Sequence, residues 1–454
     1  MIDMTLDEIN EILQGNKVGT QAMITGVSID TRTLSAGDLY IAISGEQFDG
    51  HDFITQAEQN GAVALVVTKQ VTTDLPQIIV QNTHLALAEL AGAVRNKLQL
   101  KVCAITGSNG KTTVKEMIAA ILAVNYQVLF TLGNLNNDIG VPLTLLRLNK
   151  QHQFAVIEMG ANHSGEIANT SHYAKPDVAI ITNVGAAHIE GFGSVEGVAQ
   201  AKAEIIASLA DDGVAVLNAD DDFFTAWCAI AEPRKVLSFG LASKADVRAE
   251  KIITEMRGKQ FKTCFELVAG SESIPVSLAL AGEHNVKNAL AASAACIALG
   301  VKLAQIQAGL EQVKAVKGRL QLFESESGIK VINDTYNANP ASLTVALDVL
   351  QQCQGEHWLA LGAFGELGDD SGKMHREMGE LIKKSGVQRL FATGKMAENT
   401  VQAFGEGAVY YAAKDDLIDV LTNEITTEQI LLVKGSRVQK MEVVVNALLS
   451  VTGK

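Results

Sequence analysis

The chain lacks a surplus of positive charge. Its 454 residues include 37 Lys and Arg against 51 Asp and Glu, which gives a formal net charge of -14 at pH 7. Proteins that bind nucleic acid usually meet the phosphate backbone with an excess of Lys and Arg. The composition therefore argues against a nucleic-acid partner. It leaves a phosphorylated small molecule open, because such a ligand is held by a few local N–H groups and cations.

Cysteine is also scarce. There are five cysteines, an odd number, and they form no Cys-x-x-Cys pair and no spacing typical of metal ligands. We expect all five to be reduced and mostly buried thiols, at Cys103, Cys228, Cys264, Cys296 and Cys353.

Long apolar runs are missing as well. No stretch approaches the ~20 apolar residues of a membrane-spanning helix. The first residues, MIDMTLDEINEILQG, lack the basic flank and apolar centre of a signal peptide. We therefore expect no membrane span and a cytoplasmic protein.

Hydrophobic residues nevertheless make up 47% of the chain, enough for folded cores throughout. At about 150 residues per domain, the length predicts roughly three domains. Short apolar runs at 38–43, 64–67 and 78–80 indicate a small α/β domain over 1–82. A helix at 85–98 follows, and its expected apolar face consists of Leu85, Ala88, Leu90, Ala91 and Val94.

A strand–loop–helix pattern then repeats from about 101 to 316, which predicts a central domain over 83–316. Its strands, at 102–105, 154–157, 178–181 and 214–217, are continuous apolar runs, as in a parallel sheet buried on both faces. A linker near 313–318 precedes a third series, with strands at 330–333, 358–361, 390–392, 409–412 and 430–433. We expect a Rossmann-like domain over 317–454, although no Gly-x-Gly-x-x-Gly motif opens it.

The clearest motif is Thr106-Gly-Ser-Asn-Gly-Lys-Thr-Thr113, between a predicted strand and a predicted helix. Small residues let successive backbone N–H groups surround a phosphate, and the helix N-terminus adds partial positive charge. Lys111 would reach the outer phosphates and the Thr112 hydroxyl would bind Mg²⁺. Ile105 stands where the commonest spacing has Gly, so an ordinary glycine-rich turn is the alternative. The motif predicts a P-loop ATPase type of central domain.

Two further polar residues follow neighbouring strands. Glu158 ends the second strand, and His188 lies in the loop after the third, Ile181-Thr-Asn-Val-Gly-Ala-Ala-His188. Parallel sheets bind ligands beyond the carboxyl ends of their strands, so both side chains are expected beside the phosphate loop. A carboxylate there is a natural Mg²⁺ ligand. His188 taken alone would be read as structural or exposed.

In this order of motifs the sequence resembles the Mur ligases over nearly its whole length. The short glycine-rich loop of that family explains Ile105. The resemblance implies that Glu158 and His188 bind Mg²⁺, and that Lys202 is carbamylated and binds or orients a second Mg²⁺. From its own surroundings, Glu196-Gly-Val-Ala-Gln-Ala-Lys-Ala-Glu204, Lys202 reads as a solvated surface lysine on a helix.

The resemblance also implies an ATP site. Gly282-Glu-His-Asn-Val-Lys-Asn-Ala-Leu290 is similar to the segment that holds the adenine, and the alternative is a capped helix start. Gly318-Arg319 matches the linker arginine of the family. The expected ATP-binding residues are Gly107, Ser108, Asn109, Gly110, Lys111, Thr112, Thr113, Asn285, Asn288, Arg319 and Asp334.

Three stretches indicate the substrates. Ser28-Ile-Asp-Thr-Arg32 with Phe48-Asp-Gly-His-Asp52 resembles the uridine-binding part, and 133–144 resembles the loop that meets the sugar peptide. Asp334-Thr-Tyr-Asn-Ala-Asn-Pro340 has the form used by members that add D-alanyl-D-alanine. The expected substrate-binding residues are Ser28, Asp30, Arg32, Asp49, Asn136, Asn137, Asp138, Asn337 and Asn339.

The resemblance therefore implies an enzyme that uses ATP and Mg²⁺, with two cations expected, to join UDP-N-acetylmuramoyl-tripeptide to D-alanyl-D-alanine. We expect a monomer, although no sequence feature determines the oligomeric state. The expected catalytic residues are Lys111, Glu158, His188 and Lys202. One alternative is a folylpolyglutamate synthase-like ligase, which lacks the uridine-binding part. Another is a non-catalytic nucleotide switch, which would not need Glu158, His188 and Lys202 together.

Overall fold

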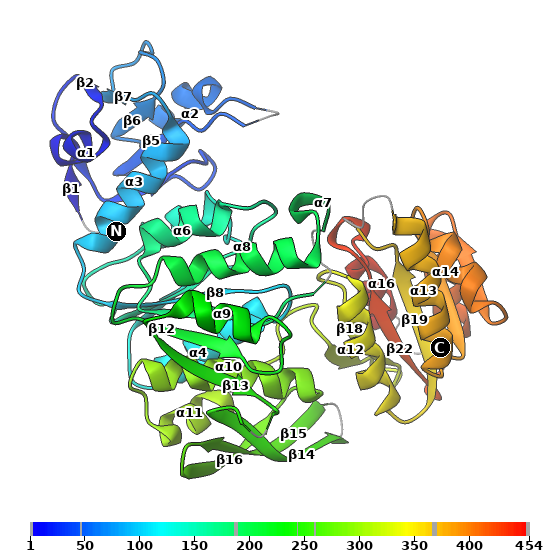
Figure 1. The fold of residues 1–454 in the computed structure, drawn as a ribbon. Coiled ribbons are helices and arrows are strands. Elements are labelled where there is room, and N and C mark those ends of the chain that lie inside the picture. The colour runs from blue at the N-terminus through cyan, green and yellow to red at the C-terminus, as the bar shows by residue number, and fades with distance from the viewer. Residues whose placement is uncertain are drawn as a thin grey trace.

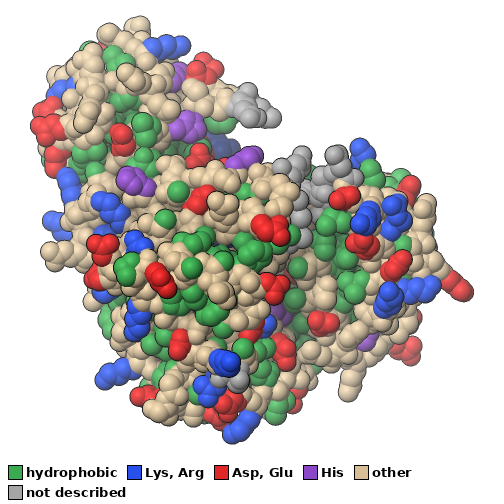
Figure 2. All heavy atoms as spheres, in the orientation of Figure 1, with side chains coloured by type: hydrophobic (Ala, Val, Ile, Leu, Met, Phe, Trp, Pro, Cys, Tyr) green, Lys and Arg blue, Asp and Glu red, His purple; other side chains and the backbone are tan. Residues whose placement is uncertain are grey.

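The computed structural model describes residues 3–45, 48–185, 189–242, 244–257, 260–365 and 370–450. Figure 1 shows three bodies, with the N-terminal body in blue above the central one and the C-terminal body, yellow to red, beside it. Within the described residues, no helix is both long and apolar enough to cross a membrane. Figure 2 shows acidic and basic side chains interspersed over the visible face.

The N-terminal body is built on a five-stranded sheet in the order β2-β7-β6-β5-β4. Its strands are β2 (Asn16–Val18), β4 (Gly26–Ser28), β5 (Asp38–Ile41), β6 (Ala64–Val67) and β7 (Gln77–Ile79). The predicted strands at 38–43, 64–67 and 78–80 are thus confirmed to within two residues. Helices α1 (Leu6–Leu13) and α2 (Ile54–Gln59) and the pair β1 (Met4–Thr5) and β3 (Met23–Ile24) complete it.

Helix α3 (Thr83–Asn96) joins this body to the central one and packs on α5 (Gly140–Leu145) and α6 (Glu166–Ala174). Asn82 caps it by accepting a hydrogen bond from the Leu85 N–H at 3.0 Å. The predicted apolar face is wrong at Leu85, which is 48% exposed. The buried face is centred on Leu87 and Leu90, and Leu85 points the other way because two residues turn a helix by about 200°.

The central body contains a nine-stranded sheet in the order β16-β15-β14-β13-β12-β11-β8-β10-β9. The parallel strands are β8 (Lys101–Thr106), β9 (Val128–Phe130), β10 (Phe154–Glu158), β11 (Val178–Ile181), β12 (Val214–Asn218), β13 (Lys235–Gly240) and β14 (Val247–Arg257). Successive residues of β8 point to opposite faces of the sheet. Val102 and Ala104 pack into one hydrophobic core, and Cys103 and Ile105 pack into the other. Burial of both faces explains the continuous apolar runs.

Helices cover each face of this sheet. The Cys103 face meets α4 (Lys111–Ala123), α10 (Glu283–Ala298) and α11 (Leu303–Leu310). The Val102 face meets α3 with α5 (Gly140–Leu145), α6 (Glu166–Ala174) and α8 (Val195–Ala207), and α9 (Phe224–Ala231) packs on α8. A short helix α7 (Ile189–Phe192) precedes α8.

The repeating strand–loop–helix prediction is wrong over the last three strands of this sheet. Strands β14, β15 (Gln260–Ala269) and β16 (Glu272–Leu278) follow one another without helices and pair antiparallel. In β15 the burial alternates residue by residue, as in a sheet that covers a core with one face. The signal for this arrangement lay in β16, where the apolar residues Ile274, Val276 and Leu278 alternate with Pro275 and Ser277.

The C-terminal body has a six-stranded sheet, β17-β18-β22-β19-β20-β21. Strand β17 (Gln321–Glu324) is antiparallel, and β18 (Lys330–Asp334), β19 (Glu356–Gly362), β20 (Arg389–Thr393), β21 (Ala408–Tyr411) and β22 (Gln429–Lys434) are parallel. The five predicted strands are confirmed to within two residues. The helices are α12 (Pro340–Gln351), α13 (Ser371–Lys384), α14 (Ala397–Phe404), α15 (Lys414–Glu424) and α16 (Glu442–Leu449).

Candidate active site

The phosphate loop lies between β8 and α4, and two of its glycines are required by close neighbours. Gly107 has a φ of +145°, and a Cβ there would lie 1.9 Å from Thr182 Oγ1. Gly110 has a φ of +84°, and its Cβ would lie 2.4 Å from Asn288 Oδ1. Any side chain at either position would collide with a group of the surrounding site, so the loop needs these glycines.

Residues at the end of β11 hold the loop in place. The Asn109 N–H donates to Asn183 Oδ1 at 3.0 Å, and the Asn109 carbonyl accepts from Thr182 Oγ1 at 2.6 Å. The Ser108 N–H donates to the Asn183 carbonyl at 2.9 Å. These bonds fix the backbone that would surround a phosphate before any ligand binds.

Glu158, at the end of β10, is buried beside the first turn of α4. Its Oε1 accepts hydrogen bonds from Thr112 Oγ1 at 3.2 Å and Asn136 Nδ2 at 2.9 Å. Its Oε2 is buried and has no hydrogen-bond partner among the described residues. The Lys115 ammonium lies 3.9 Å from this oxygen, beyond hydrogen-bond distance, so a bound cation would supply the direct contact that the oxygen lacks.

These groups fit a magnesium ion. Glu158 Oε2 and the Thr112 hydroxyl are oxygen atoms, which Mg²⁺ prefers. The described residues contain no cluster of three His, Cys, Asp or Glu side chains that could hold a metal without further ligands. His188 lies outside the described residues, so its predicted role stays a prediction.

Lys111 begins α4 and folds back over the loop. Its Nζ donates to the Gly107 carbonyl at 2.6 Å. Burial lowers the pKa of the Lys111 ammonium, and the charge of Arg319 lowers it further while Glu158 acts in the opposite direction. A bound phosphate would replace the Gly107 carbonyl as the partner of Lys111, and its negative charge would compensate the buried positive charge.

Sequence reasoning missed Lys115, one turn further along α4. Its side chain is 1% exposed, and its Nζ donates to the Thr131 carbonyl at 2.7 Å. The same Nζ lies 3.0 Å from Glu116 Oε1 and 3.9 Å from Glu158 Oε2. The signal was available, because residues four apart share a helix face and Lys115 is four after Lys111.

Arg319 reaches the phosphate loop from the start of the C-terminal body. Its Nη2 donates to Thr112 Oγ1 at 3.1 Å, and its Nε is buried with no partner in the described parts of the chain. An arginine with an unsatisfied donor beside a phosphate loop is suited to bind a phosphate oxygen. This position agrees with the predicted role of Arg319 at the phosphates, which stays a prediction.

Asp334, at the end of β18, is paired with a second lysine that the sequence left unassigned. Lys434 ends the neighbouring strand β22, is 1% exposed, and its Nζ lies 2.5 Å from Asp334 Oδ2. Lys434 also donates to the Asn337 carbonyl at 3.1 Å. These contacts of Lys434 hold the segment 334–339 in place. In the same segment, Asn339 Nδ2 donates to Asn109 Oδ1 of the central body at 3.1 Å.

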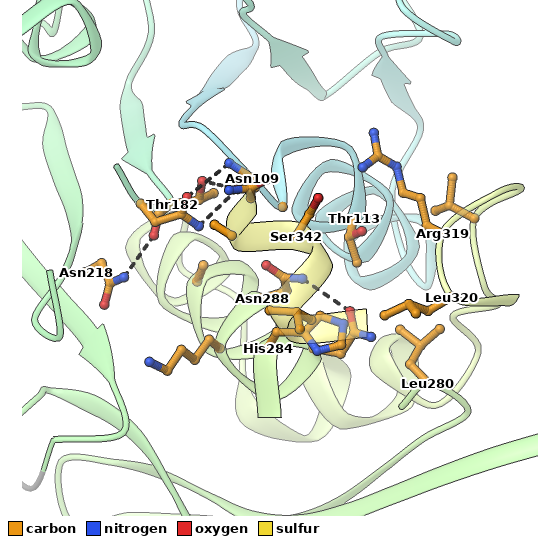
Figure 3. Close-up of a pocket in the computed structure, with 18 of the residues that line it drawn as sticks. Asn109, Thr113, Thr182, Asn218, Leu280, His284, Asn288, Arg319, Leu320 and Ser342 are labelled. Atoms are coloured by element: carbon orange, nitrogen blue, oxygen red, sulfur yellow. Dashed lines mark hydrogen bonds between the residues drawn. The ribbon is translucent and has the colours of Figure 1, made fainter. Parts of the chain in front are cut away.

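A pocket of about 370 Å³ lies next to the loop, between the central and C-terminal bodies. Figure 3 shows Asn109 and Thr182 at one part of its wall and His284 and Leu280 at another. Asn285 and Asn288 line it, and Asn288 Nδ2 donates to Asn285 Oδ1 at 3.2 Å. Asp334 and Arg319 line the same pocket. The pocket thus brings together seven of the eleven residues predicted to bind ATP, whereas Gly107, Ser108, Lys111 and Thr112 do not line it.

Lys202 is buried on α8, with 2% of its surface exposed, so the interpretation as a solvated lysine is wrong. Its Nζ lies 5.4 Å from the centre of the Phe192 ring. Burial, with a smaller contribution from the charge of Lys111, lowers the pKa of Lys202 to about 7. The residues three and four positions away on the helix, Val198, Ala199, Ile205 and Ile206, are all apolar and buried, so the spacing favoured burial although the charge of Lys202 suggested solvent.

The other predicted substrate residues lie apart from this pocket. In the N-terminal body, Arg32 forms an ion pair with Asp30 at 2.6 Å and Ser28 Oγ accepts from the Asp30 N–H. Asp49 Oδ1 lies 2.6 Å from His51 Nδ1, and hydrogen bonds from His51 hold the pKa of the Asp49 carboxyl far below its usual range.

The residues of the predicted substrate loop, 133–144, differ in where their side chains point. Asn136 points inward to Glu158, whereas Asn137 Oδ1 accepts from the Gly140 N–H at 2.9 Å and Asp138 is exposed. Asn337 is exposed and Asn339 caps α12. Only Asn136 and Asn339 therefore contact the phosphate site directly.

Comparison with known proteins decides the family. The chain matches the Mur ligase family, catalytic domain, over 23–101, the Mur ligase middle domain over 105–296, and the Mur ligase, glutamate ligase domain, over 318–437. The chain belongs to the Mur ligase family. This family forms amide bonds with ATP, so the chain is an ATP-dependent ligase, as the motifs predicted.

Individual relatives match along the whole chain. UDP-N-acetylmuramoyl-tripeptide–D-alanyl-D-alanine ligase from Escherichia coli is 44% identical over 99% of both chains. A crystal structure of MurF from Acinetobacter baumannii superposes with a TM-score of 0.93 at 38% identity, covering 98% of this chain and 99% of that one. MurF from Thermotoga maritima in complex with ADP gives a TM-score of 0.84 at 28% identity, covering 93% and 97%.

Proposed function

We propose that this Mur ligase joins D-alanyl-D-alanine to UDP-N-acetylmuramoyl-tripeptide and converts ATP to ADP and phosphate. The observation that carries the proposal is the meeting of Lys111, Thr112 and Arg319 around the buried carboxylate of Glu158. The relative from Escherichia coli, similar over its full length, carries the same activity in its name.

A carboxylate does not react with an amine at neutral pH, so it must be activated first. The tripeptide carboxylate oxygen attacks the γ-phosphorus of ATP, ADP leaves, and an acyl phosphate forms. The amine of D-alanyl-D-alanine then attacks the acyl carbon, and the tetrahedral intermediate collapses to the amide and inorganic phosphate. Lys111 and Arg319 would neutralise the charge on the transferring phosphoryl group.

The proposal includes two Mg²⁺ ions, held by Thr112, Glu158, His188 and Lys202 as its carbamate. When bound, the ions would neutralise the phosphate oxygens and orient them. Burial of Lys202 and its lowered pKa support the carbamate, because CO₂ adds to a neutral amine and a carbamate replaces a buried positive charge with a negative one beside cations.

The remaining binding roles are also proposals. Asn285 and Asn288 would contact the adenine, and Asp334 the ribose or phosphates. The uridine would bind the N-terminal body at Ser28, Asp30, Arg32 and Asp49, and the peptide parts would lie between Asn136–Asp138 and Asn337–Asn339. The domain boundaries 82/83 and 316/317 and a cytoplasmic location, where ATP and nucleotide sugars are made, belong to the same proposal.

Reconstitution tests this function. ATP, Mg²⁺, UDP-N-acetylmuramoyl-tripeptide and D-alanyl-D-alanine are incubated with the enzyme, and the pentapeptide is detected by mass. Omission of each component should abolish the product. Replacement of D-alanyl-D-alanine by L-glutamate distinguishes the folylpolyglutamate synthase-like alternative, and ATP hydrolysis without any amide product would favour a nucleotide switch.

A further inference from the structure

The phosphate loop gives the Arg319 side chain a single hydrogen bond, which leaves its conformation weakly restricted. Its only hydrogen bond to a described side chain is the one from Nη2 to Thr112 Oγ1 at 3.1 Å. Its Nε stays without a partner in the described structure. A long arginine side chain loses about 2 kcal/mol of rotamer entropy when it is held in one conformation. Something else must therefore restrict it.

The aromatic ring of Tyr336 is in the position to do this. The guanidinium carbon of Arg319 lies 4.2 Å from the centre of the Tyr336 ring. A guanidinium stacks well on an aromatic face, both through its charge and through its flat shape. The stack covers one face of the guanidinium, while the buried Nε–H at its edge has no hydrogen-bond partner in the described structure.

The backbone fixes the two partners relative to each other. The Tyr336 N–H donates to the Gly318 carbonyl at 3.0 Å, directly before Arg319. Gly318 has a φ of +73°, and a Cβ there would lie 3.1 Å from Tyr336 N. The linker and the segment 334–337 are thus held in one arrangement, while the Tyr336 hydroxyl donates no hydrogen bond to another described residue.

We propose that Tyr336 is a positioning residue, whose ring holds Arg319 over the phosphate loop so that Arg319 meets the phosphates of ATP. This inference rests on the proposed function for the role of Arg319. Tyr336 acts through its ring, so loss of the hydroxyl is tolerated and loss of the ring is not. Its effect passes through Arg319 alone.

A double-mutant cycle on nucleotide binding tests the inference. The affinity for a non-hydrolysable ATP analogue with Mg²⁺ is measured by calorimetry for wild type, Tyr336→Phe, Tyr336→Leu, Arg319→Ala and Tyr336→Leu/Arg319→Ala. We expect Tyr336→Phe to stay within twofold of wild type. Tyr336→Leu should weaken binding about tenfold, and should change the Arg319→Ala protein less than twofold, because the two residues act as one unit.

A merely structural Tyr336 would give another pattern. Equal affinities for Tyr336→Leu and Tyr336→Phe, or an undiminished loss from Tyr336→Leu in the Arg319→Ala protein, would overturn the inference. Circular dichroism checks folding, and Tyr336→Gln replaces Tyr336→Leu if the latter does not fold. Because binding is measured without turnover, failure here is distinct from failure of the ligase reaction, which wild-type protein reports.

Discussion

The ammonium group of Lys115 lies 3.9 Å from Glu158 Oε2, and both side chains are almost completely buried, at 1% and 2% exposure. Lys115 also donates to the Thr131 carbonyl, and Thr131 Oγ1 accepts from the Glu158 N–H at 3.0 Å. This charge pair thus connects three segments: Lys115 lies on α4, Glu158 ends β10 and Thr131 follows β9.

We expect Lys115→Met to destabilise the protein by about 3 kcal/mol, because it leaves the Glu158 carboxylate buried without its counter-charge. Turnover should fall at least tenfold, since Glu158 loses its fixed position. Urea unfolding and pentapeptide formation are the measurements. Glu116→Gln, which changes the more exposed partner of Lys115, is the matched control and should unfold within about 0.5 kcal/mol of wild type. Wild-type stability of Lys115→Met would contradict the account.

The pair Lys434–Asp334 predicts a similar cost in the C-terminal body. Lys434→Met should lower the free energy of unfolding by about 3 kcal/mol, because Asp334 stays buried without its ion-pair partner. Lys395→Met, an exposed lysine on the same body, serves as control and should leave unfolding unchanged. If both variants unfold alike, Lys434 does not hold Asp334 in the way the geometry indicates.

Lys202 provides a direct test of the carbamate. Lys202→Ala should be nearly inactive, and short carboxylic acids should restore part of its turnover by filling the place of the carbamate. Incubation of the wild-type protein with ¹³C-bicarbonate should give a carbamate carbon signal by NMR that Lys202→Ala lacks. Full activity in Lys202→Ala, or the same signal in both proteins, would remove the carbamate from the mechanism.

His284 makes stability depend on pH. Burial lowers the pKa of His284 to about 4, with Lys434 adding to the shift and Asp334 opposing it. The unfolded chain, with a pKa near ~6.5, binds a proton first as pH falls, so the folded state loses stability between about pH 6.5 and 4. We expect the loss from pH 7.5 to pH 5, measured by urea unfolding without nucleotide, to be about 2 kcal/mol smaller in His284→Asn, since each pH unit between the two pKa values contributes about 1.4 kcal/mol. Equal losses would show that His284 is not responsible.

Much of this arrangement was predictable from the sequence. The strands of the parallel sheets followed from continuous apolar runs, and the phosphate loop followed from Thr106–Thr113 in its strand–helix context. The predicted burial of Leu85 was wrong because an apolar residue in the first turn of a helix can point away from the core. The prediction for β14–β16 failed because the strand–loop–helix repeat was extended over this segment. Apolar residues at every second position there indicate consecutive strands instead.

The site was predictable where residues follow strands and not where the partner comes from a distant segment. Glu158 was assigned to the site because strand ends gather at one edge of a sheet, and Asp334 because its segment resembles that of the Mur ligases. Lys115 could have been identified from its spacing to Lys111. Lys434 also ends a strand, but a buried lysine looks like a surface lysine until its carboxylate partner is known. Lys202 differs: its charge suggested solvent, although the apolar residues three and four positions away on its helix already favoured burial.

The central claim is that the tripeptide carboxylate is activated by phosphorylation. The measurement is transfer of ¹⁸O from the labelled terminal carboxylate of the tripeptide to inorganic phosphate during turnover with ATP, Mg²⁺ and D-alanyl-D-alanine. An acyl phosphate leaves one carboxylate oxygen on the phosphate it releases, so each pentapeptide formed should be matched by one phosphate carrying a single ¹⁸O. Pentapeptide formed together with unlabelled phosphate would contradict the account.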